Sequence, residues 1–113
     1  MSDCIFCKIA AGEIPSNKVY EDDKVVAFYD LNPNAKVHVL VIPKEHIANV
    51  AEIDETNSAV VAHIFEVIAK LAKELNLDQG FRVVSNCKEY GGQSVFHLHF
   101  HLLGGEQLSM KMC

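Results

Sequence analysis

The chain has 113 residues, of which 50% are hydrophobic and 22% charged, and its formal net charge is −5. This length fits a single domain spanning residues 1–113, and the acidic balance argues against nucleic acid or an anionic membrane as a partner. The sequence shows no secretory signal and no run near the ~20 apolar residues of a spanning helix, which predicts a cytoplasmic protein with reduced cysteines.

The N-terminal half predicts one short helix followed by strands. Residues 4–11 (CIFCKIAA) are compatible with a short helix that ends before Pro15. A strand-like segment begins at residues 19–20 and stops at the turn EDD. Residues 24–31 and 37–43 are rich in β-branched and aromatic side chains, which is typical of strands, and the turn NPNAK separates them.

In residues 53–75 the apolar residues follow helical spacing, unlike those of the preceding strand-like segments. Asp54, Thr56 or Asn57 can cap the start of this helix, and Gly80 lies just beyond its end. Its apolar stripe is broad enough to face both a core and a partner subunit. The stripe consists of Val61, Ile64, Phe65, Ile68, Leu71, Ala72 and Leu75.

The C-terminal part returns to strand patterns. Residues 81–86 (FRVVSN) predict a strand, CKEYGGQ a loop, and residues 95–103 a last strand that Gly104 and Gly105 close. Mostly strands with one long helix indicate an α+β fold with a largely antiparallel sheet.

Three of the six histidines, His97, His99 and His101, alternate with apolar residues in this last strand. Because side chains alternate across a strand, the histidines are expected to share one face and the apolar residues the core face. Same-face neighbours lie about 6–7 Å apart. Two imidazoles at that separation can flank a phosphate-sized group.

The histidine row has three interpretations. A solvated polar face would more usually carry Thr, Lys, Glu or Ser. A metal held by all three histidines would commonly add carboxylates, and the nearest acids, Glu89 and Glu106, lie outside the strand. In the third interpretation one histidine is a nucleophile and its neighbours support it, since a pKa near ~6.5 leaves a neutral nitrogen at pH 7.

The loop before the strand, residues 90–94 (YGGQS), favours the third interpretation. Gly91 and Gly92 let the backbone approach a ligand closely, and successive backbone N–H groups can cradle an anion. Gln93 and Ser94 add side-chain donors. Beside three histidines, this loop predicts a phosphate pocket without a lysine.

These residues resemble the histidine triad (HIT) superfamily, whose motif H-φ-H-φ-H-φ-φ (φ apolar) matches HLHFHLL at residues 97–103. The segments around CIFCKIAAGEIP, VIPKEHI and NCKEYGGQSV are similar to the histidine triad nucleotide-binding branch, so the resemblance covers nearly the whole chain. It implies a HIT-like fold, a homodimer with a sheet extended across it, and no organic cofactor. It also implies hydrolysis of purine nucleoside 5′-phosphoramidates and of acyl or aminoacyl adenylates to the nucleoside monophosphate.

The resemblance implies catalytic roles for four of the six histidines. His99 would attack the α-phosphate and form a nucleotidyl-histidine, which water hydrolyses. His101 would contact the phosphate and help the leaving group, and His97 belongs to the same catalytic set. His38 would support the nucleophile, although the residues alone favour a histidine satisfied by backbone in an apolar strand.

The nucleoside end is implied by the same resemblance. Asp30 would accept the ribose hydroxyls, which suits a carboxylate, although an acid at a strand end also caps turns. The apolar slot for the base, unless its residues are simply core, comprises Ile5, Phe6, Phe28, Tyr29 and Leu31. The phosphate and leaving-group loop comprises Asn86, Gly92, Gln93 and Ser94.

Cys4 and Cys7 form a C-x-x-C pair, which by itself indicates either a metal site or a redox pair. The resemblance to bacterial zinc-binding members implies a structural Zn²⁺ held by these thiols together with His46 and His97. Two thiolates and two imidazoles suit tetrahedral zinc, and a closed shell indicates structure rather than catalysis. The site would tie the N-terminus to the sheet.

Three other functions remain open from the sequence. They are a dinucleoside polyphosphate hydrolase, a nucleotide-binding or interaction module with incidental activity, and an enzyme with a catalytic metal on the histidine row. GGQSV and the short chain favour the phosphoramidase. The tail GGEQLSMKMC lacks a tryptophan, which leaves the leaving group open. Cys87 and Cys113 have no assigned role, and His63 is expected at the surface or an interface.

Overall fold

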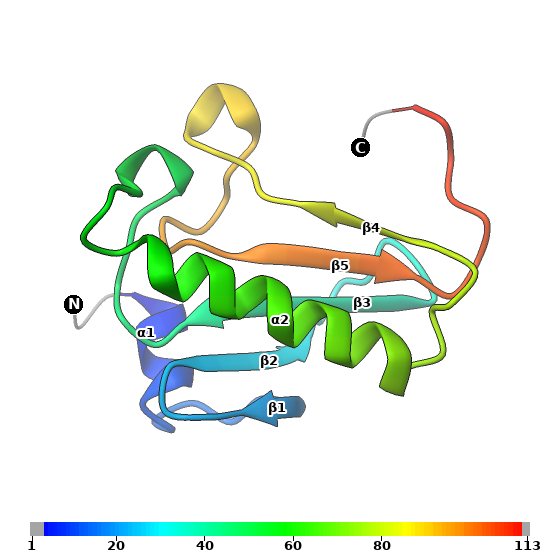
Figure 1. Ribbon diagram of the computed structural model, residues 1–113. Coiled ribbons are helices and arrows are strands. Elements are labelled where there is room, and N and C mark those ends of the chain that lie inside the picture. Colours follow the sequence, from blue (N-terminus) through cyan, green and yellow to red (C-terminus); the bar gives the residue numbers. More distant parts are fainter. Residues whose placement is uncertain (1–3, 112–113) are drawn as a thin grey trace.

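The computed structural model describes residues 4–111 and has one five-stranded sheet with two helices (Figure 1). The strand order is β1-β2-β3-β5-β4, and every neighbouring pair is antiparallel. The α+β prediction is therefore confirmed. No helix in the described part of the chain is both long and apolar enough to cross a membrane. The elements are α1 (Ile5–Ala10), β1 (Lys18–Glu21), β2 (Val25–Tyr29), β3 (Val37–Pro43), α2 (Ser58–Glu74), β4 (Phe81–Val84) and β5 (Phe100–Gly104), with short 3-10 turns at Val50–Glu52 and Glu89–Gly91.

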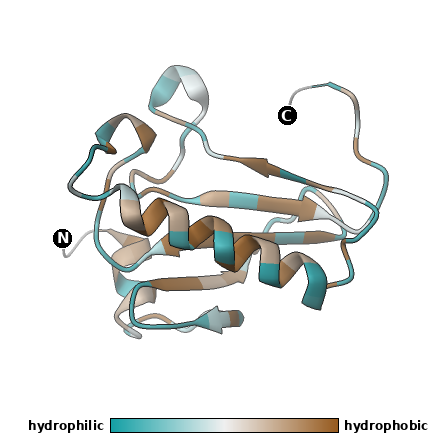
Figure 2. Ribbon diagram, in the orientation of Figure 1, coloured by the Kyte–Doolittle hydropathy of each residue, from teal (hydrophilic) through white to brown (hydrophobic). Residues whose placement is uncertain are grey.

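The sheet buries both of its faces against different helices. On one face α2 lies across the strands, and its residues Ile64, Ile68 and Leu71 join the larger core cluster. On the other face α1 contributes Phe6 and Ile9 to a smaller cluster. Apart from His38, successive residues of β2 and β3 alternate between these clusters, which is why both strands are mostly apolar and appear largely brown in Figure 2.

The end of α2 lies where the helical spacing of the sequence ends, but the residue that terminates it was not predicted. The helix stops at Glu74, and Asn76 rather than Gly80 takes the left-handed conformation that ends it, with φ 61°. The N–H of Asn76 donates to the Lys73 carbonyl and that of Leu77 to the Ala72 carbonyl. This pair of bonds is a Schellman motif, in which asparagine substitutes for glycine.

The last strand is shorter than predicted. Ladder pairing begins at Phe100, so residues 95–99 precede β5 rather than belong to it. The Leu98 N–H donates to the Ile47 carbonyl at 2.6 Å instead of to β3. The alternation of side chains nevertheless persists, because Leu98, Phe100 and Leu102 all reach the core on the α2 face.

His63 ties α2 to the β1–β2 turn. Its Nε2 lies 2.6 Å from an Asp22 carboxylate oxygen, and the other Asp22 oxygen accepts the N–H groups of Lys24 and Val25. The Asp22 partner raises the pKa of His63. His63 is therefore a half-buried residue that pairs two elements and lies outside the histidine row.

Candidate active site and metal cluster

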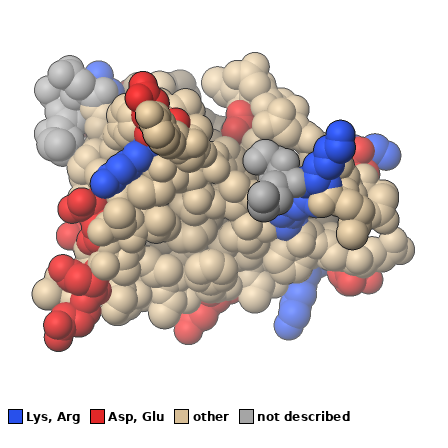
Figure 3. Space-filling view, turned by 90° about the horizontal axis from the view of Figure 1, so that it is seen from above, with Lys and Arg blue, Asp and Glu red and all other residues tan. Residues whose placement is uncertain are grey.

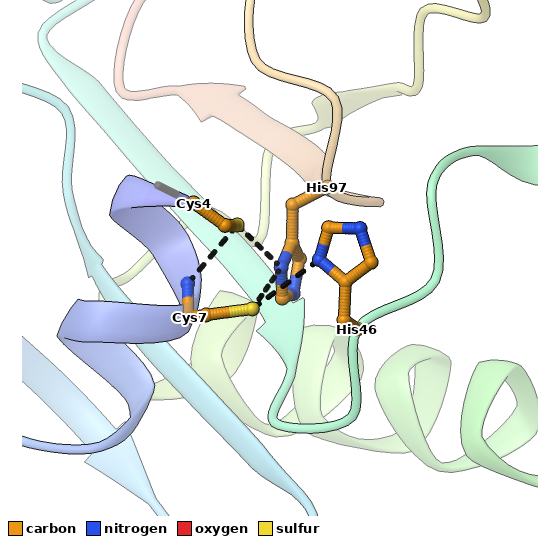
Figure 4. Close-up of side chains that lie close together, drawn as sticks. All are labelled: Cys4, Cys7, His46 and His97. Atoms are coloured by element: carbon orange, nitrogen blue, oxygen red, sulfur yellow. Dashed lines mark hydrogen bonds between the residues drawn. The ribbon is translucent and has the colours of Figure 1, made fainter. Parts of the chain in front are cut away.

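Two histidine clusters lie on the sheet face that carries α1. The first gathers Cys4, Cys7, His46 and His97, whose side chains point toward one another from α1, from the loop after β3 and from the segment before β5 (Figure 4). Cys7 Sγ lies 3.2 Å from His46 Nδ1, and Cys4 Sγ lies 3.3 Å from His97 Nδ1. The four ligand atoms lie within 4.8 Å of one another, so the cluster could hold a metal ion.

The surroundings of His97 direct its lone pair into this cluster. Its Nε2 lies 2.8 Å from the Pro43 carbonyl oxygen, which can only accept a hydrogen, so we assign the proton to Nε2 and the lone pair to Nδ1. Burial lowers the pKa of His97 to about 4, which keeps the ring neutral. A carbonyl that orients the other nitrogen is the usual support of a metal-ligating histidine.

The thiols complete a donor set that suits a soft or borderline metal. Cys4 Sγ accepts the Cys7 N–H at 3.3 Å and so caps the start of α1. Burial raises the pKa of the Cys7 thiol to about 11. A metal bound there would therefore displace a thiol proton, because thiolates rather than thiols are the ligands.

The second cluster lines a pocket of about 380 Å³ beside α1. Nine of the residues predicted for the nucleotide line it: Ile5, Phe6, Phe28, Tyr29, Asp30, Leu31, Ser94, His99 and His101. Leu31 is 93% exposed and forms part of its rim. The pocket thus brings together an apolar wall, a carboxylate and two imidazoles.

His99 presents one free nitrogen to this pocket. Its Nδ1 lies 2.7 Å from the His97 carbonyl oxygen, so Nδ1 carries the proton and Nε2 carries the lone pair. Burial lowers the pKa of His99, which favours the neutral ring. The His99 ring lies 5.0 Å from the His101 ring and 5.1 Å from Phe6, centroid to centroid.

His38 and His101 form a directed pair. The Asn34 N–H donates to His38 Nδ1 at 3.0 Å, so a neutral His38 carries its proton on Nε2. That Nε2 lies 2.8 Å from His101 Nδ1, which must accept, and the second nitrogen of His101 is left as an N–H donor. Burial lowers the pKa of both rings, that of His101 to about 4.

Asp30 has two contacts at the pocket. One carboxylate oxygen accepts the Asn32 N–H at 2.8 Å, and the other lies 3.4 Å from His38 Nε2. The turn-capping role that the sequence allowed is thus present, and the same carboxylate also lines the pocket. Asp30, His38 and His101 form a second group of possible metal ligands within 4.8 Å.

The loop after β4 is built differently from the prediction. Gln93 is buried, and both hydrogens of its amide are used by the carbonyls of Ala48 and Val95, so it holds the loop in shape. Gly92 has φ 80°, a conformation that favours glycine. Of the four loop residues predicted for the phosphate, Ser94 lines the pocket, whereas Asn86, Gly92 and Gln93 do not.

Sequence reasoning missed several contributors. Ile9 and Leu40 line the pocket, and Ile9 follows Ile5 at helical spacing, which could have identified it. The Pro43 and His97 carbonyls and the Asn34 N–H set the histidine protons. These three are backbone groups, so the residue types in the sequence do not predict them.

The fold and the site define an α+β protein with a histidine-lined pocket beside a Cys2His2 cluster. The HIT domain family model matches residues 11–108. A histidine triad protein from Clostridium difficile is 55% identical, with a TM-score of 0.95 over 99% of this chain and 98% of that one. A HIT family hydrolase from Clostridium thermocellum is 48% identical, with a TM-score of 0.96 over 100% and 99%. A histidine triad nucleotide-binding protein from Candida albicans is 37% identical, with a TM-score of 0.81 over 98% and 87%.

The chain therefore belongs to the HIT domain family. The resemblance found in the motif at residues 97–103 is confirmed at the level of family and fold.

Proposed function

We propose that the protein is a hydrolase that cleaves the P–N or acyl-phosphate bond of purine nucleoside 5′-phosphoramidates and acyl or aminoacyl adenylates. The observation that carries the proposal is the Nδ1–H of His99 on the His97 carbonyl at 2.7 Å, which leaves Nε2 as a free nucleophile in the pocket. The hydrolase named among the similar structures supports the reaction class, and the nucleotide-binding protein supports the ligand class.

The chemistry follows from the assigned protons. His99 Nε2 attacks the α-phosphorus, the P–N bond breaks, and the leaving nitrogen takes a proton from solvent and departs as the amine. The phosphoryl-imidazolium that forms is stabilised by its Nδ1–H on the His97 carbonyl. His101 donates its second N–H toward the phosphate and leaving group, while His38 fixes the His101 tautomer. Water then attacks the phosphorus, the P–Nε2 bond breaks, and a water proton returns to solvent, so that the monophosphate and neutral His99 are released.

The rest of the pocket would hold the nucleoside. Asp30 at the pocket wall would accept the ribose hydroxyls, and the apolar wall around Phe6 and Phe28 would hold the purine. Ser94 would donate to the phosphate. Gln93 would act indirectly, since its hydrogen bonds shape the loop that carries Ser94.

The Cys2His2 cluster would hold a structural zinc ion. Its four donors converge, and the site is closed by protein ligands, which suits Zn²⁺ in tetrahedral geometry. The ion would join the N-terminal helix to the sheet within one domain, residues 1–113. Reduced thiols fit a cytoplasmic protein.

A homodimer with a continuous sheet is the proposed assembly. β4 is an edge strand, and Phe81 on it and Phe65 on α2 are 44% and 47% exposed. Figure 3 looks down from the β4 side and shows a broad area of uncharged side chains in the middle of the view. An exposed edge with aromatic side chains is a surface that proteins commonly cover.

The test compares two substrates and one variant. Wild-type protein is expected to hydrolyse adenosine 5′-monophosphoramidate faster than a diadenosine polyphosphate. His99→Ala should lower kcat for the phosphoramidate by at least about a thousandfold, because the nucleophile is lost.

Circular dichroism of His99→Ala controls for folding. Undiminished turnover by the folded variant would sink the covalent mechanism. Faster turnover of the diadenosine polyphosphate would instead identify a dinucleoside polyphosphate hydrolase, and AMP binding without turnover of either substrate a binding module.

A further inference from the structure

We propose that Phe6 is a positioning residue that couples metal occupancy of the Cys2His2 cluster to nucleotide affinity in the neighbouring pocket. The inference rests on the proposed nucleotide pocket. Metal ions and nucleotides would then each tighten the binding of the other, although they occupy separate sites on the same sheet face.

Helix α1 serves both sites at once. Cys4 and Cys7 turn their thiols toward the metal cluster, while Ile5, Phe6 and Ile9 line the pocket. The six-residue helix together with its N-cap Cys4 therefore carries two of the four possible metal ligands and part of the apolar pocket wall. Any shift of α1 alters both sites together.

Phe6 is the side chain that touches both sites. Its ring lies edge-on to His97 with centroids 5.9 Å apart, to His99 at 5.1 Å and to Phe28 at 5.6 Å. It is 6% exposed, so it has little room to move independently. Phe6 thus joins a metal ligand, the candidate nucleophile and the base slot in one packed group.

A second connection runs through the backbone of His97. The imidazole of His97 faces the thiols, and its carbonyl accepts the Nδ1–H of His99 at 2.7 Å. A metal that fixes the His97 ring also restrains this carbonyl. The orientation of His99 in the pocket is therefore set by the same residue that closes the metal cluster.

α1 needs an external restraint to stay in place. Isolated helices shorter than about 12 residues are marginal in water. Besides the packing of Phe6 and Ile9 against β2, β3 and the histidine rings, α1 is tied to the rest of the fold by the two thiols, which contact His46 and His97. Loss of metal is therefore expected to loosen α1 and the pocket wall while the core on the α2 face stays intact.

Thermodynamic linkage makes the effect measurable from both sides. If metal raises nucleotide affinity by some factor, nucleotide must raise metal affinity by the same factor. Couplings of this kind are typically between about 5- and 150-fold. We expect about tenfold here.

The experiment measures both affinities by calorimetry and by chelator competition. AMP binding is compared between zinc-loaded protein and protein freed of metal, and Zn²⁺ binding is compared with and without saturating AMP. The AMP Kd should rise about tenfold on metal removal, and AMP should tighten Zn²⁺ binding by the same factor. Circular dichroism should show that the sheet persists without metal.

A matched pair of variants separates the proposed coupling role of Phe6 from its direct contact with the bound nucleotide. Phe6→Leu weakens AMP binding directly, but it should also bring the coupling factor close to one, which a wall residue alone would leave unchanged. Phe65→Leu is the control, because Phe65 makes a similar edge contact with Phe100 on the opposite face. It should retain the full coupling.

Three results would overturn the proposal. They are an AMP Kd that does not change with metal, a coupling factor that survives Phe6→Leu, and global unfolding of the metal-free chain. Absence of AMP binding by the zinc-loaded protein is a separate outcome, which overturns the nucleotide pocket itself and this inference with it.

Discussion

The two groups of possible metal ligands differ in the backbone group that faces one histidine ring in each, His97 in the first and His38 in the second. In the Cys2His2 cluster a carbonyl, that of Pro43, takes the Nε2–H of His97, and Nδ1 keeps a lone pair for a metal. In the group of Asp30, His38 and His101 beside the pocket, an N–H, that of Asn34, donates to His38 Nδ1, and Nε2 keeps a proton. A metal cannot bind at a nitrogen that carries a proton. Similar residues at similar distances are therefore suited to different chemistry.

The comparison shows that proximity of donors does not define a metal site. Asp30, His38 and His101 are as close together as the four residues of the other cluster. A metal on His38 would need the proton to move to Nδ1, where it would meet the Asn34 N–H. The main chain thus keeps His38 and His101 as hydrogen-bond donors.

A cobalt titration is the most direct test of this difference between the two groups of possible metal ligands. We expect one tight equivalent of Co²⁺ per chain, with thiolate charge-transfer absorption, and any binding in the pocket roughly a thousandfold weaker, or about 4 kcal/mol. A second tight equivalent that disappears in His38→Ala would contradict the assigned tautomers.

Substitution of a thiol should affect stability through metal alone. At zinc about a hundredfold above its Kd, bound metal stabilises the fold by about 2.7 kcal/mol. Cys7→Ser should lose most of this free energy of unfolding in the presence of zinc and little in the presence of a chelator. Cys87→Ser removes a free thiol outside both clusters and is the matched control. Equal losses with and without metal would assign Cys7 to packing instead.

Substitution of the pocket carboxylate should affect ligand affinity alone. Asp30→Asn keeps an oxygen for the Asn32 N–H but loses the charge, so AMP affinity should fall about tenfold, or about 1.4 kcal/mol. Calorimetry measures the affinity, and metal analysis should still give one equivalent. Loss of metal in this variant would show that the two clusters are not distinct in function.

His63 provides a reference histidine outside both clusters, with the smallest expected effect. Asp22 raises its pKa, so its ion pair stabilises the fold fully below pH about 6.5, and the contribution is lost as pH rises through the raised pKa. His63→Gln should cost roughly 0.5 kcal/mol at pH 6 and nearly nothing at pH 9, as measured by urea unfolding. The contribution of His101 to folding stability has the opposite pH dependence. Burial lowers the pKa of His101, so this contribution is lost as pH falls below about 6.5. An effect of His63→Gln that grows with pH would contradict the pairing.

The sequence predicted which side chains are buried better than it predicted backbone pairing and helix termination. Alternation placed Leu98 in the core correctly, although residues 95–99 lie outside the ladder, because alternation depends on extended backbone rather than on pairing. The end of α2 was predicted to within one residue, but the left-handed Asn76 that follows it was not, since asparagine is a weaker signal than glycine for this conformation.

The candidate site shows the same division. The HLHFHLL motif and the C-x-x-C pair predicted the residues of the two clusters. The structure brings Cys4, Cys7, His46 and His97 together as expected. Gln93 was expected to face a ligand and instead holds its own loop, because the partners of a buried amide depend on the tertiary fold. The roles of the site residues stay predictions until the variants are measured.

The double use of His97 has a consequence for mutational scanning. Its imidazole and its carbonyl serve different neighbours, but substitution replaces only the imidazole. A scan of all amino acids at this position would thus report on the imidazole, the proposed metal ligand, and not on the carbonyl that accepts the His99 N–H. Tolerance to substitution at a position reports what its side chain does. In this molecule part of the site consists of backbone atoms, which no substitution of that residue removes.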